Sequence, residues 1–244
     1  MKYAIIAIVL LICAAFALSA CRKKDTGETK PTISGLDASG QSTLLYQGHG
    51  SLRITTRDGK VIYVDPYAGS DKGYKKPADL ILVTHGHPDH NNIDKVESRN
   101  PDCRVITWKD ALKGGVHQTF ELDYVTVEAV EAGYNPNHNV KECVGYILTL
   151  PEGVTVYVCG DTSRTKQMPD LAQRHLDYAF FCCDGKFNMD VEEAAQCAVL
   201  VGARHNVPYH MAPGALFDKT RAEQFQAPNR LIIADGQEIP LVKE

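Results

Sequence analysis

The sequence lacks a stretch of basic residues that could form a positively charged stripe on a folded domain. Five of the 26 lysine and arginine residues and three of the 30 aspartate and glutamate residues lie in the first 40 positions, which leaves 21 basic against 27 acidic residues in the remainder. A protein that binds nucleic acid through its phosphates normally presents such a stripe. The composition therefore predicts no nucleic-acid partner.

Regular cysteine spacing is also absent. Two of the eight cysteines lie near the N-terminus, at Cys13 and Cys21, and the other six are Cys103, Cys143, Cys159, Cys182, Cys183 and Cys197. Disulfides are the alternative for an exported domain, but two of these six are adjacent and four lie in apolar patterns. We predict buried free thiols, because a free cysteine behaves as a small apolar core residue.

An uncharged apolar run extends from Tyr3 to Ala20 and is followed at once by Cys21. The ending Leu-Ser-Ala-Cys resembles the lipobox of a bacterial lipoprotein signal. This resemblance implies cleavage before Cys21, attachment of lipid to its thiol, and an exported protein anchored to a membrane of the cell envelope. A retained transmembrane anchor is the alternative, because the run is longer than a usual signal-peptide core. Both alternatives place the domain outside the cytoplasm.

The rest of the chain divides into a short linker and one domain. Residues 21–41 are rich in charged and small residues and contain few large apolar ones, which predicts a flexible tether that starts at the lipidated Cys21. Residues 42–244 have a length suited to a single compact domain. We therefore expect a signal peptide at 1–20, a tether at 21–41 and one folded domain at 42–244.

A dense cluster of metal-binding side chains follows the apolar segment 79–83. It reads His-Gly-His-Pro-Asp-His and contributes His85, His87, Asp89 and His90. Imidazole and carboxylate together suit zinc, manganese or iron. Alternation along an extended segment turns His85 and His87 to one side, while the two later residues lie in the turn and can reach a second point. The cluster predicts ligands for two metal ions; histidines that cap a strand or lie on the surface are the ordinary alternative.

The pattern His-x-His-x-Asp-His resembles the signature of the metallo-β-lactamase superfamily of metal-dependent hydrolases. The resemblance implies that Asp161, in Gly-Asp-Thr after an apolar strand, is the bridging carboxylate, and that His210, at the end of Val-x-Pro-x-His, is the last ligand. His138 is the candidate for the histidine expected between them. It falls several residues later than usual, so its loop must fold back; a surface histidine and a more weakly bound ion are the alternative.

The same resemblance implies how these side chains share their work. One ion would be held by His85, His87 and His138, the second by Asp89, His90 and His210, and Asp161 would bridge them. The ions, zinc or manganese before iron, would share a hydroxide that attacks the substrate. Asp89 would orient this hydroxide and take its proton. Asp65 would hold the histidine loop from behind.

Strands outnumber helices in the expected secondary structure. Strands are predicted at 43–46, 52–55, 60–64, 80–83, 104–107, 124–129, 144–148, 154–158, 176–181, 230–233 and 238–241, with a short strand leading to His210. Helices are predicted at 108–112, 167–173, 191–201 and 219–225, the third capped by a box of Asp190 and Glu193. This order resembles the four-layer αββα sandwich, an α+β fold, of the metallo-β-lactamase superfamily.

Four segments resemble one branch of that superfamily, the ascorbate-6-phosphate lactonase-like hydrolases. They are residues 46–51, 64–66, 160–162 and 189–195, whereas residues 182–186 depart from the branch. The likeness implies hydrolysis of a lactone or phosphodiester bond in a small-molecule substrate. His49, Lys186 and Tyr209 are candidate substrate contacts, with a solvated Lys186 as the alternative. The competing class is a non-catalytic lipoprotein that binds a metal or ligand, but such a protein would be expected to lose Asp161 or His210.

Overall fold

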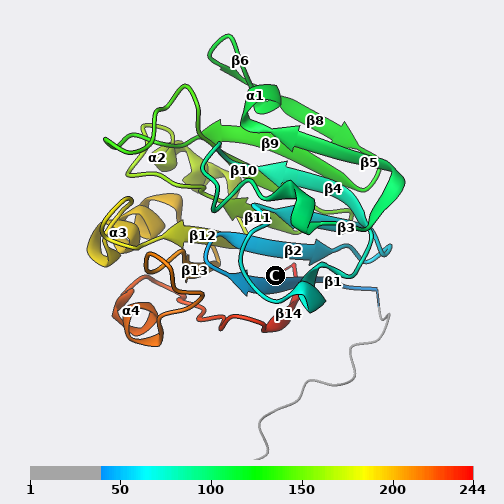
Figure 1. Cartoon of the computed structure of the whole chain (residues 1–244). Helices are drawn as coiled ribbons and strands as arrows, with labels where there is room; N and C mark the ends of the chain where they lie inside the picture. The colour runs from blue at the N-terminus through cyan, green and yellow to red at the C-terminus, as the bar shows by residue number, and fades with distance from the viewer. Residues whose placement is uncertain (1–39, 244) are drawn as a thin grey trace, which may run out of the picture. The chain divides into compact units, whose positions relative to one another are not determined.

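The computed structural model describes residues 40–243 (Figure 1). The predicted signal peptide at 1–20, the lipidation site Cys21 and all but the last two positions of the predicted tether at 21–41 lie outside the described residues. Among the helices that the structure does describe, none is long and apolar enough to cross a membrane.

The first half of the chain forms one six-stranded sheet. Its strands are β1 (Ser42–Gly48), β2 (Ser51–Thr55), β3 (Val61–Val64), β4 (Ala78–Val83) and β5 (Arg99–Thr107), and the C-terminal β14 (Glu238–Leu241) joins them in the order β14-β1-β2-β3-β4-β5. The strands β1, β2 and β3 pair antiparallel, and β3, β4 and β5 pair parallel. A tight turn at Asp58-Gly59 joins β2 to β3, since Thr56 N donates to Lys60 O at 2.8 Å and Gly59 has a φ of 82°.

The second half forms an equivalent sheet. Its strands are β8 (Thr119–Leu122), β9 (Val125–Glu131), β10 (Val144–Thr149), β11 (Thr155–Val158), β12 (Tyr178–Cys182) and β13 (His205–Tyr209), in the order β13-β12-β11-β10-β9-β8. The strands β11, β12 and β13 are parallel to one another, and β9 and β10 pair antiparallel. A small separate hairpin of β6 (Leu112–Lys113) and β7 (Val116–His117) precedes this sheet.

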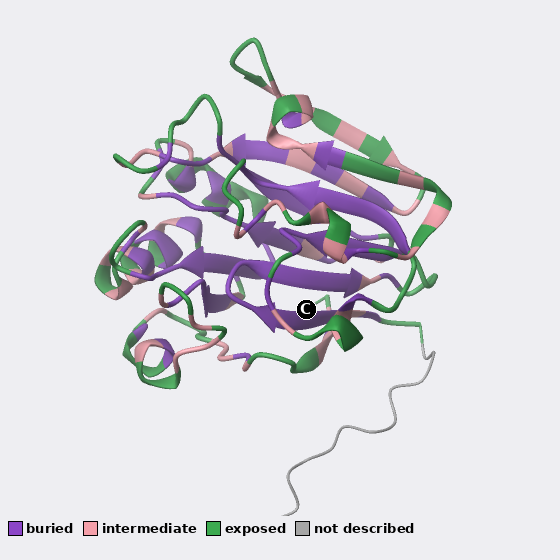
Figure 2. Cartoon of the chain, viewed as in Figure 1, coloured by how far each residue is buried: buried purple, intermediate pink, exposed green. Residues whose placement is uncertain are grey.

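The core lies mainly between the two sheets. In β4, Leu80 and Leu82 belong to the large apolar cluster that also contains Val127 and Tyr146 of the second sheet. The alternate residue Ile81 belongs to a smaller cluster on the other face of the first sheet. This is the alternation expected of a strand with both faces covered, and each such side chain contributes roughly 1.5–3 kcal/mol of burial free energy. Figure 2 shows the central strands buried and the edge strand β5 largely exposed.

The helices are short, and most lie in the second half. They are α1 (Trp108–Ala111), α2 (Met168–Leu171), α3 (Val191–Val201) and α4 (Lys219–Gln224), with 3-10 turns η1 (Asp71–Tyr74), η2 (Ile93–Lys95) and η3 (Ala172–Arg174). Asp190 caps α3 by accepting from Glu193 N at 2.8 Å. The predicted box is half formed, because the Glu193 carboxylate accepts from Arg164 N instead of Asp190 N.

The two stacked sheets with helices outside confirm the predicted αββα sandwich. The predicted strand at 230–233 is wrong. Arg230 forms a single bridge with Asn206 of β13, and the chain then crosses to the other sheet, where Gly236 N donates to Tyr46 O at 2.8 Å. Five of the six predicted buried thiols are buried and free, and Cys103 is free but partly exposed.

Candidate metal centre

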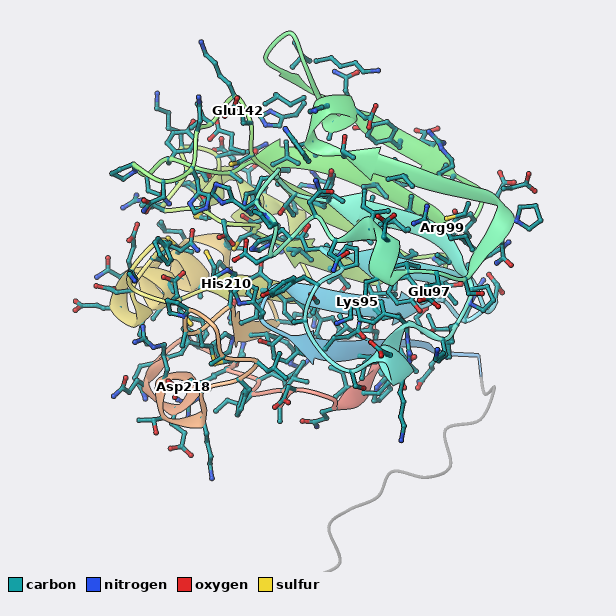
Figure 3. All side chains as sticks on the ribbon, in the orientation of Figure 1. Lys95, Glu97, Arg99, Glu142, His210 and Asp218 are labelled. Carbon is teal, nitrogen blue, oxygen red and sulfur yellow. The ribbon has the colours of Figure 1, made fainter. Side chains whose placement is uncertain are left out.

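The strand directions bring the predicted ligands to one edge of the sandwich. Asp65 follows β3, the His85–His90 segment follows β4, Asp161 follows β11 and His210 follows β13. These are carboxyl ends of strands that run parallel within their sheets: β3 pairs directly with β4, and β11 and β13 both pair with β12. Such ends meet at one edge of a sheet. Figure 3 shows His210 on the side of the sandwich where α3 lies.

One ligand group consists of His85, His87 and His138. Each offers one ring nitrogen, and these three nitrogens lie within 4.8 Å of one another. His85 and His138 are buried and His87 is exposed. His85 Nδ1 lies 3.1 Å from the Thr84 hydroxyl oxygen. His138 Nδ1 lies 3.1 Å from the side-chain oxygen of Asn135. Each of these contacts turns the other ring nitrogen, Nε2, toward the group.

The loop that carries His138 does fold back, as this ligand requires. Gly133 N donates to Asp161 O at 3.1 Å, and Ser163 N donates to Gly133 O at 2.7 Å. Gly133 has a φ of 90°, and a Cβ there would approach His138 O to 2.8 Å. Only glycine accommodates both conditions. The loop is thus fastened to the turn that bears Asp161.

Asp161 lies at the centre of the cluster. Its carboxylate oxygens are 3.4 Å from His90 Nε2, 3.3 Å from His138 Nε2 and 3.4 Å from His210 Nε2. Within the described chain these three nitrogens are buried and have no hydrogen-bond partner. Buried polar atoms rarely lack a hydrogen-bond partner, because each unsatisfied atom lowers the folding stability by about 1–3 kcal/mol.

A metal ion explains both the spacing and the missing partners. Two ligand atoms at about 2.1 Å from a tetrahedral zinc ion lie about 3.4 Å apart, whereas an N–H···O hydrogen bond is usually about 2.9–3.0 Å long. The three Asp161 distances match the first value. The donor set of imidazole and carboxylate also suits zinc, manganese and iron. The residues present therefore fit a resident metal.

The second ligand group consists of His49, Asp89, His90 and His210. It contains the predicted second set and adds His49, which the sequence suggested as a substrate contact. The His49 and His210 rings lie 3.8 Å apart between centroids, and the His90 and His210 rings stack at 5.2 Å. His49 Nε2 lies 3.2 Å from Asp89 Oδ2.

Asp65 supports the second group from behind. It is fully buried, accepts from Thr84 N at 2.7 Å and from the Thr84 hydroxyl at 2.6 Å, and lies 2.8 Å from His90 Nδ1. These contacts hold the start of the histidine segment and orient the His90 ring, which is the arrangement expected of a carboxylate behind a histidine ligand.

Sequence reasoning did not predict the roles of Asp184 and Asn188. Asp184 Oδ2 lies 3.4 Å from His210 Nδ1, and Asn188 Nδ2 donates to both Asp161 at 2.9 Å and Asp184 at 2.7 Å. The sequence feature that could have indicated Asp184 is its position just after a buried strand, at the same edge of the second sheet as Asp161.

Three residues of the centre have left-handed backbone conformations. The φ angles are 50° at His49, 46° at Asp65 and 45° at His210. Such a conformation costs of order 1–3 kcal/mol for a residue other than glycine, and it persists where the surroundings fix it. The strain is therefore concentrated at the strand ends that present the candidate ligands.

The electrostatics of the centre differ between its members. Burial lowers the pKa of His85 to about 2, so this ring is neutral. Burial also opposes a charge on His90, but the carboxylates of Asp161 and Asp65 outweigh it and raise the pKa of His90 to about 9. Burial opposes the charge on Asp161 as well, yet His210 and His90 hold its pKa well below the usual range.

A cleft of about 280 Å³ leads to the first group and is lined by His85, His87, Trp108, Asn137, His138 and Glu142, among others. Of the predicted substrate contacts, Lys186 is exposed on the loop between Asp184 and Asn188. Tyr209 is fully buried, with its hydroxyl 3.4 Å from Gly160 O, so it packs behind the centre and presents no surface to a substrate.

The fold and this set of side chains define a metal-dependent hydrolase of the metallo-β-lactamase type. The pattern of the family described as "Beta-lactamase superfamily domain" matches residues 43–210. The chain belongs to this family.

Relatives and solved structures agree with that assignment. A "UPF0173 metal-dependent hydrolase" of Geobacillus thermodenitrificans is 32% identical over 189 residues, which cover 68% of this chain and 83% of the relative. A crystal structure from Parabacteroides distasonis superposes with a TM-score of 0.66 at 28% identity, covering 80% of this chain and 94% of that one. The metallo hydrolase Igni18 of Ignicoccus hospitalis shares the fold, with a TM-score of 0.65 at 19% identity and coverage of 84% and 100%.

Proposed function

We propose that the protein hydrolyses an ester-type bond, a lactone or a phosphodiester, in a small molecule and uses two divalent metal ions. The observation that carries the proposal is the convergence of three unpartnered histidine nitrogens on Asp161 at 3.3–3.4 Å. They come from three separate loops and from two ligand groups, and all three lie against one carboxylate. Zinc or manganese fits the donors best, and iron is the third candidate.

Two bound ions would lower the pKa of a shared water to near neutrality and polarise the oxygen of the bond to be broken. The chain's own residues supply the rest. Asp161 would join the two groups, and Asp89, whose carboxylate is half-exposed, would accept the proton of the attacking water. Trp108 and Glu142 form walls of the cleft in which the substrate would lie. The exposed ammonium of Lys186 would meet an anionic group of the substrate.

The substrate class follows from the likeness to the ascorbate-6-phosphate lactonase-like branch. The segments that carry this likeness include residues 46–51 and 64–66, which contain His49 and Asp65 of the centre. Residues 182–186 differ from the branch and contain Lys186. We therefore propose that the bond that is hydrolysed is a lactone or phosphodiester, as in that branch. The rest of the substrate would differ from the substrates of the branch, because residues 182–186 differ.

A reconstitution assay tests the function. The protein is stripped of metal with a chelator, reloaded with zinc or manganese, and assayed against panels of lactones and phosphodiesters. We expect turnover from the reloaded protein and from D94N, which alters an exposed carboxylate on η2, but none from D161N. Stoichiometric metal binding without turnover of either panel would instead favour the non-catalytic binding lipoprotein.

We further propose that the protein is exported and held on a membrane of the cell envelope by lipid on Cys21. The support is the apolar run up to Ala20 and the cysteine that follows it. Incorporation of a labelled fatty acid in cells tests this directly. Label should enter the wild-type protein and be absent from C21A, and equal labelling of both would contradict the proposal.

A further inference from the structure

His49 lies in the turn between β1 and β2 and is held firmly by its backbone. Its amide donates to Leu216 O at 2.8 Å, and its carbonyl accepts from His210 N at 3.0 Å and from the Tyr46 hydroxyl at 3.0 Å. These contacts fix the left-handed conformation, with a φ of 50°. The ring then packs on His210 with 3.8 Å between centroids. The position of Nε2 is thereby determined by the fold.

The nitrogen of His49 that faces the centre differs from the corresponding nitrogens of His90, His138 and His210. Nε2 of His90, His138 and His210 is unpartnered in the described chain and lies 3.3–3.4 Å from Asp161, a ligand-to-ligand spacing. Nε2 of His49 instead has a hydrogen-bond partner, Asp89 Oδ2, at 3.2 Å. It is therefore already satisfied without a metal ion.

Asp89 needs such a partner more than the other carboxylates of the centre do. Its side chain is 43% exposed, compared with 5% for Asp161 and 0% for Asp65 and Asp184. A half-exposed carboxylate on a turn samples several orientations unless something holds it. A donor at one oxygen restricts that freedom and leaves the other oxygen for a metal ion.

We propose that His49 is a positioning residue that donates from Nε2 to Asp89 Oδ2, so that Asp89 Oδ1 serves the ion held by His90 and His210. This rests on the proposed two-metal function and assigns a role within it. Under this proposal His49 orients Asp89 and is not the substrate contact that the sequence analysis suggested. Removing a partner of this kind typically costs about 10- to 100-fold in metal affinity.

Two substitutions of matched chemistry separate positioning from ligation. In H49Q the amide nitrogen takes the place of Nε2 and can still donate to Asp89. In H49N the amide is too short to reach Asp89, and asparagine tolerates the left-handed backbone. The control is H117N, since His117 is a half-buried histidine on β7 outside both ligand groups. H49F, which retains a ring against His210, provides a second loss variant should H49N fail to fold.

The readouts are chelator-competition affinities for both ions and the visible absorption spectrum of the cobalt(II)-loaded protein, which reports coordination at each ion. We expect H49N to weaken the second ion roughly 10- to 100-fold and to change its cobalt bands, with the first ion unaffected. H49Q and H117N should stay within about threefold of wild type. In a D89N background, H49N should cause no further loss of affinity for the second ion, because His49 acts only through Asp89.

The outcomes distinguish this inference from the proposed function. Wild-type protein that binds one ion or none would overturn both. Two ions in wild type together with unchanged affinity and spectrum in H49N would overturn the inference and leave the function standing. An equal loss in H49N and H49Q would also overturn it, because that result makes His49 a ligand itself.

Discussion

The two ligand groups are supported in different ways. His85 and His138 of the first group have neutral partners, the Thr84 hydroxyl and the Asn135 amide oxygen. In the second group, His90 is hydrogen-bonded to the carboxylate of Asp65 at 2.8 Å, and His210 Nδ1 lies 3.4 Å from the carboxylate of Asp184. A carboxylate behind a histidine raises its basicity and fixes its ring more strongly than a neutral acceptor does. The second group should therefore hold its ion more tightly.

The groups also differ in access. His87 of the first group is exposed, and the cleft of about 280 Å³ is lined by all three of its histidines. His90 and His210 are buried. On the proposed two-metal function, we expect the first ion to exchange more readily and to meet the substrate, and the second ion to be retained. Substitutions in either group should alter this asymmetry, and loss of the shared carboxylate should abolish it.

Replacing the Asp161 carboxylate should abolish metal binding by both ligand groups. In D161N the central charge is lost, and three buried histidine nitrogens face a neutral amide. We expect neither ion to bind at micromolar free metal and activity to fall by more than the roughly 100-fold of an outer partner. Elemental analysis after desalting measures the first effect and the reconstitution assay the second. If D161N kept one ion, Asp161 would be a ligand of only one of the two ions.

Removing Asp65 should weaken the second group selectively. D65N keeps the side-chain shape and suits the φ of 46°, but it loses the charge behind His90. The expected loss is about 10- to 100-fold in affinity for the second ion, with the first ion nearly unchanged. Competition with a chelator measures both affinities. N135A, which removes the neutral support of His138, is the matched change in the first group and should weaken the first ion by less.

D184N tests the other carboxylate of the second group and should have a smaller effect. The asparagine oxygen can still accept from Lys186 N and Phe187 N, which Asp184 Oδ1 does at 2.8 and 2.7 Å. The loop should therefore keep these two contacts, while His210 loses a nearby carboxylate charge at 3.4 Å and Asn188 Nδ2 loses its acceptor at 2.7 Å. We expect about a tenfold loss in affinity for the second ion. No change would show that Asp184 serves the loop alone.

Proton release should also distinguish the groups. In the metal-free protein the pKa of His90 is raised to about 9, so the ring carries a proton at pH 7.5 and must lose it to bind a metal. The pKa of His85 is about 2, so that ring has no proton to lose. Calorimetry in buffers of different ionisation enthalpy should show release at pH 7.5 for the second ion, and the release should vanish as the pH rises through about 9. Release that is equal for both ions would contradict the assignment.

K186A should have the smallest effect. Lys186 is exposed and lies outside both ligand groups, so metal content should stay unchanged. We expect KM for an anionic substrate to rise by a few-fold with kcat preserved, because an exposed charge pair is worth only about 0–1 kcal/mol. A neutral analogue of the same substrate is the control and should show no change.

Much of this centre could be predicted from short sequence signals. The spacing of His85 to His90 after an apolar strand, and the strand ends that bear Asp161 and His210, identified the edge of the sandwich where ligands meet. His138 was predicted in spite of its late position, and the structure shows the physical reason, since Gly133 ties its loop to the Asp161 turn.

Other features depend on contacts between residues far apart in the chain, which local patterns do not encode. Asp184 and Asn188 matter because β12 runs beside both β11 and β13, so that their loop reaches Asp161 and His210. His49 faces Asp89 through a backbone set by Leu216, well over a hundred positions later. The segment 230–233 has a strand-like composition but meets β13 at one bridge.

Metal content per chain is the most direct test of the two-group centre. The protein is purified without chelator, and its metals are quantified by elemental mass spectrometry before and after reloading with zinc or manganese. We predict about two equivalents per chain, and a brief chelator treatment should leave about one because the second group retains its ion. One equivalent or fewer even after reloading would contradict the account and remove His138 from the centre.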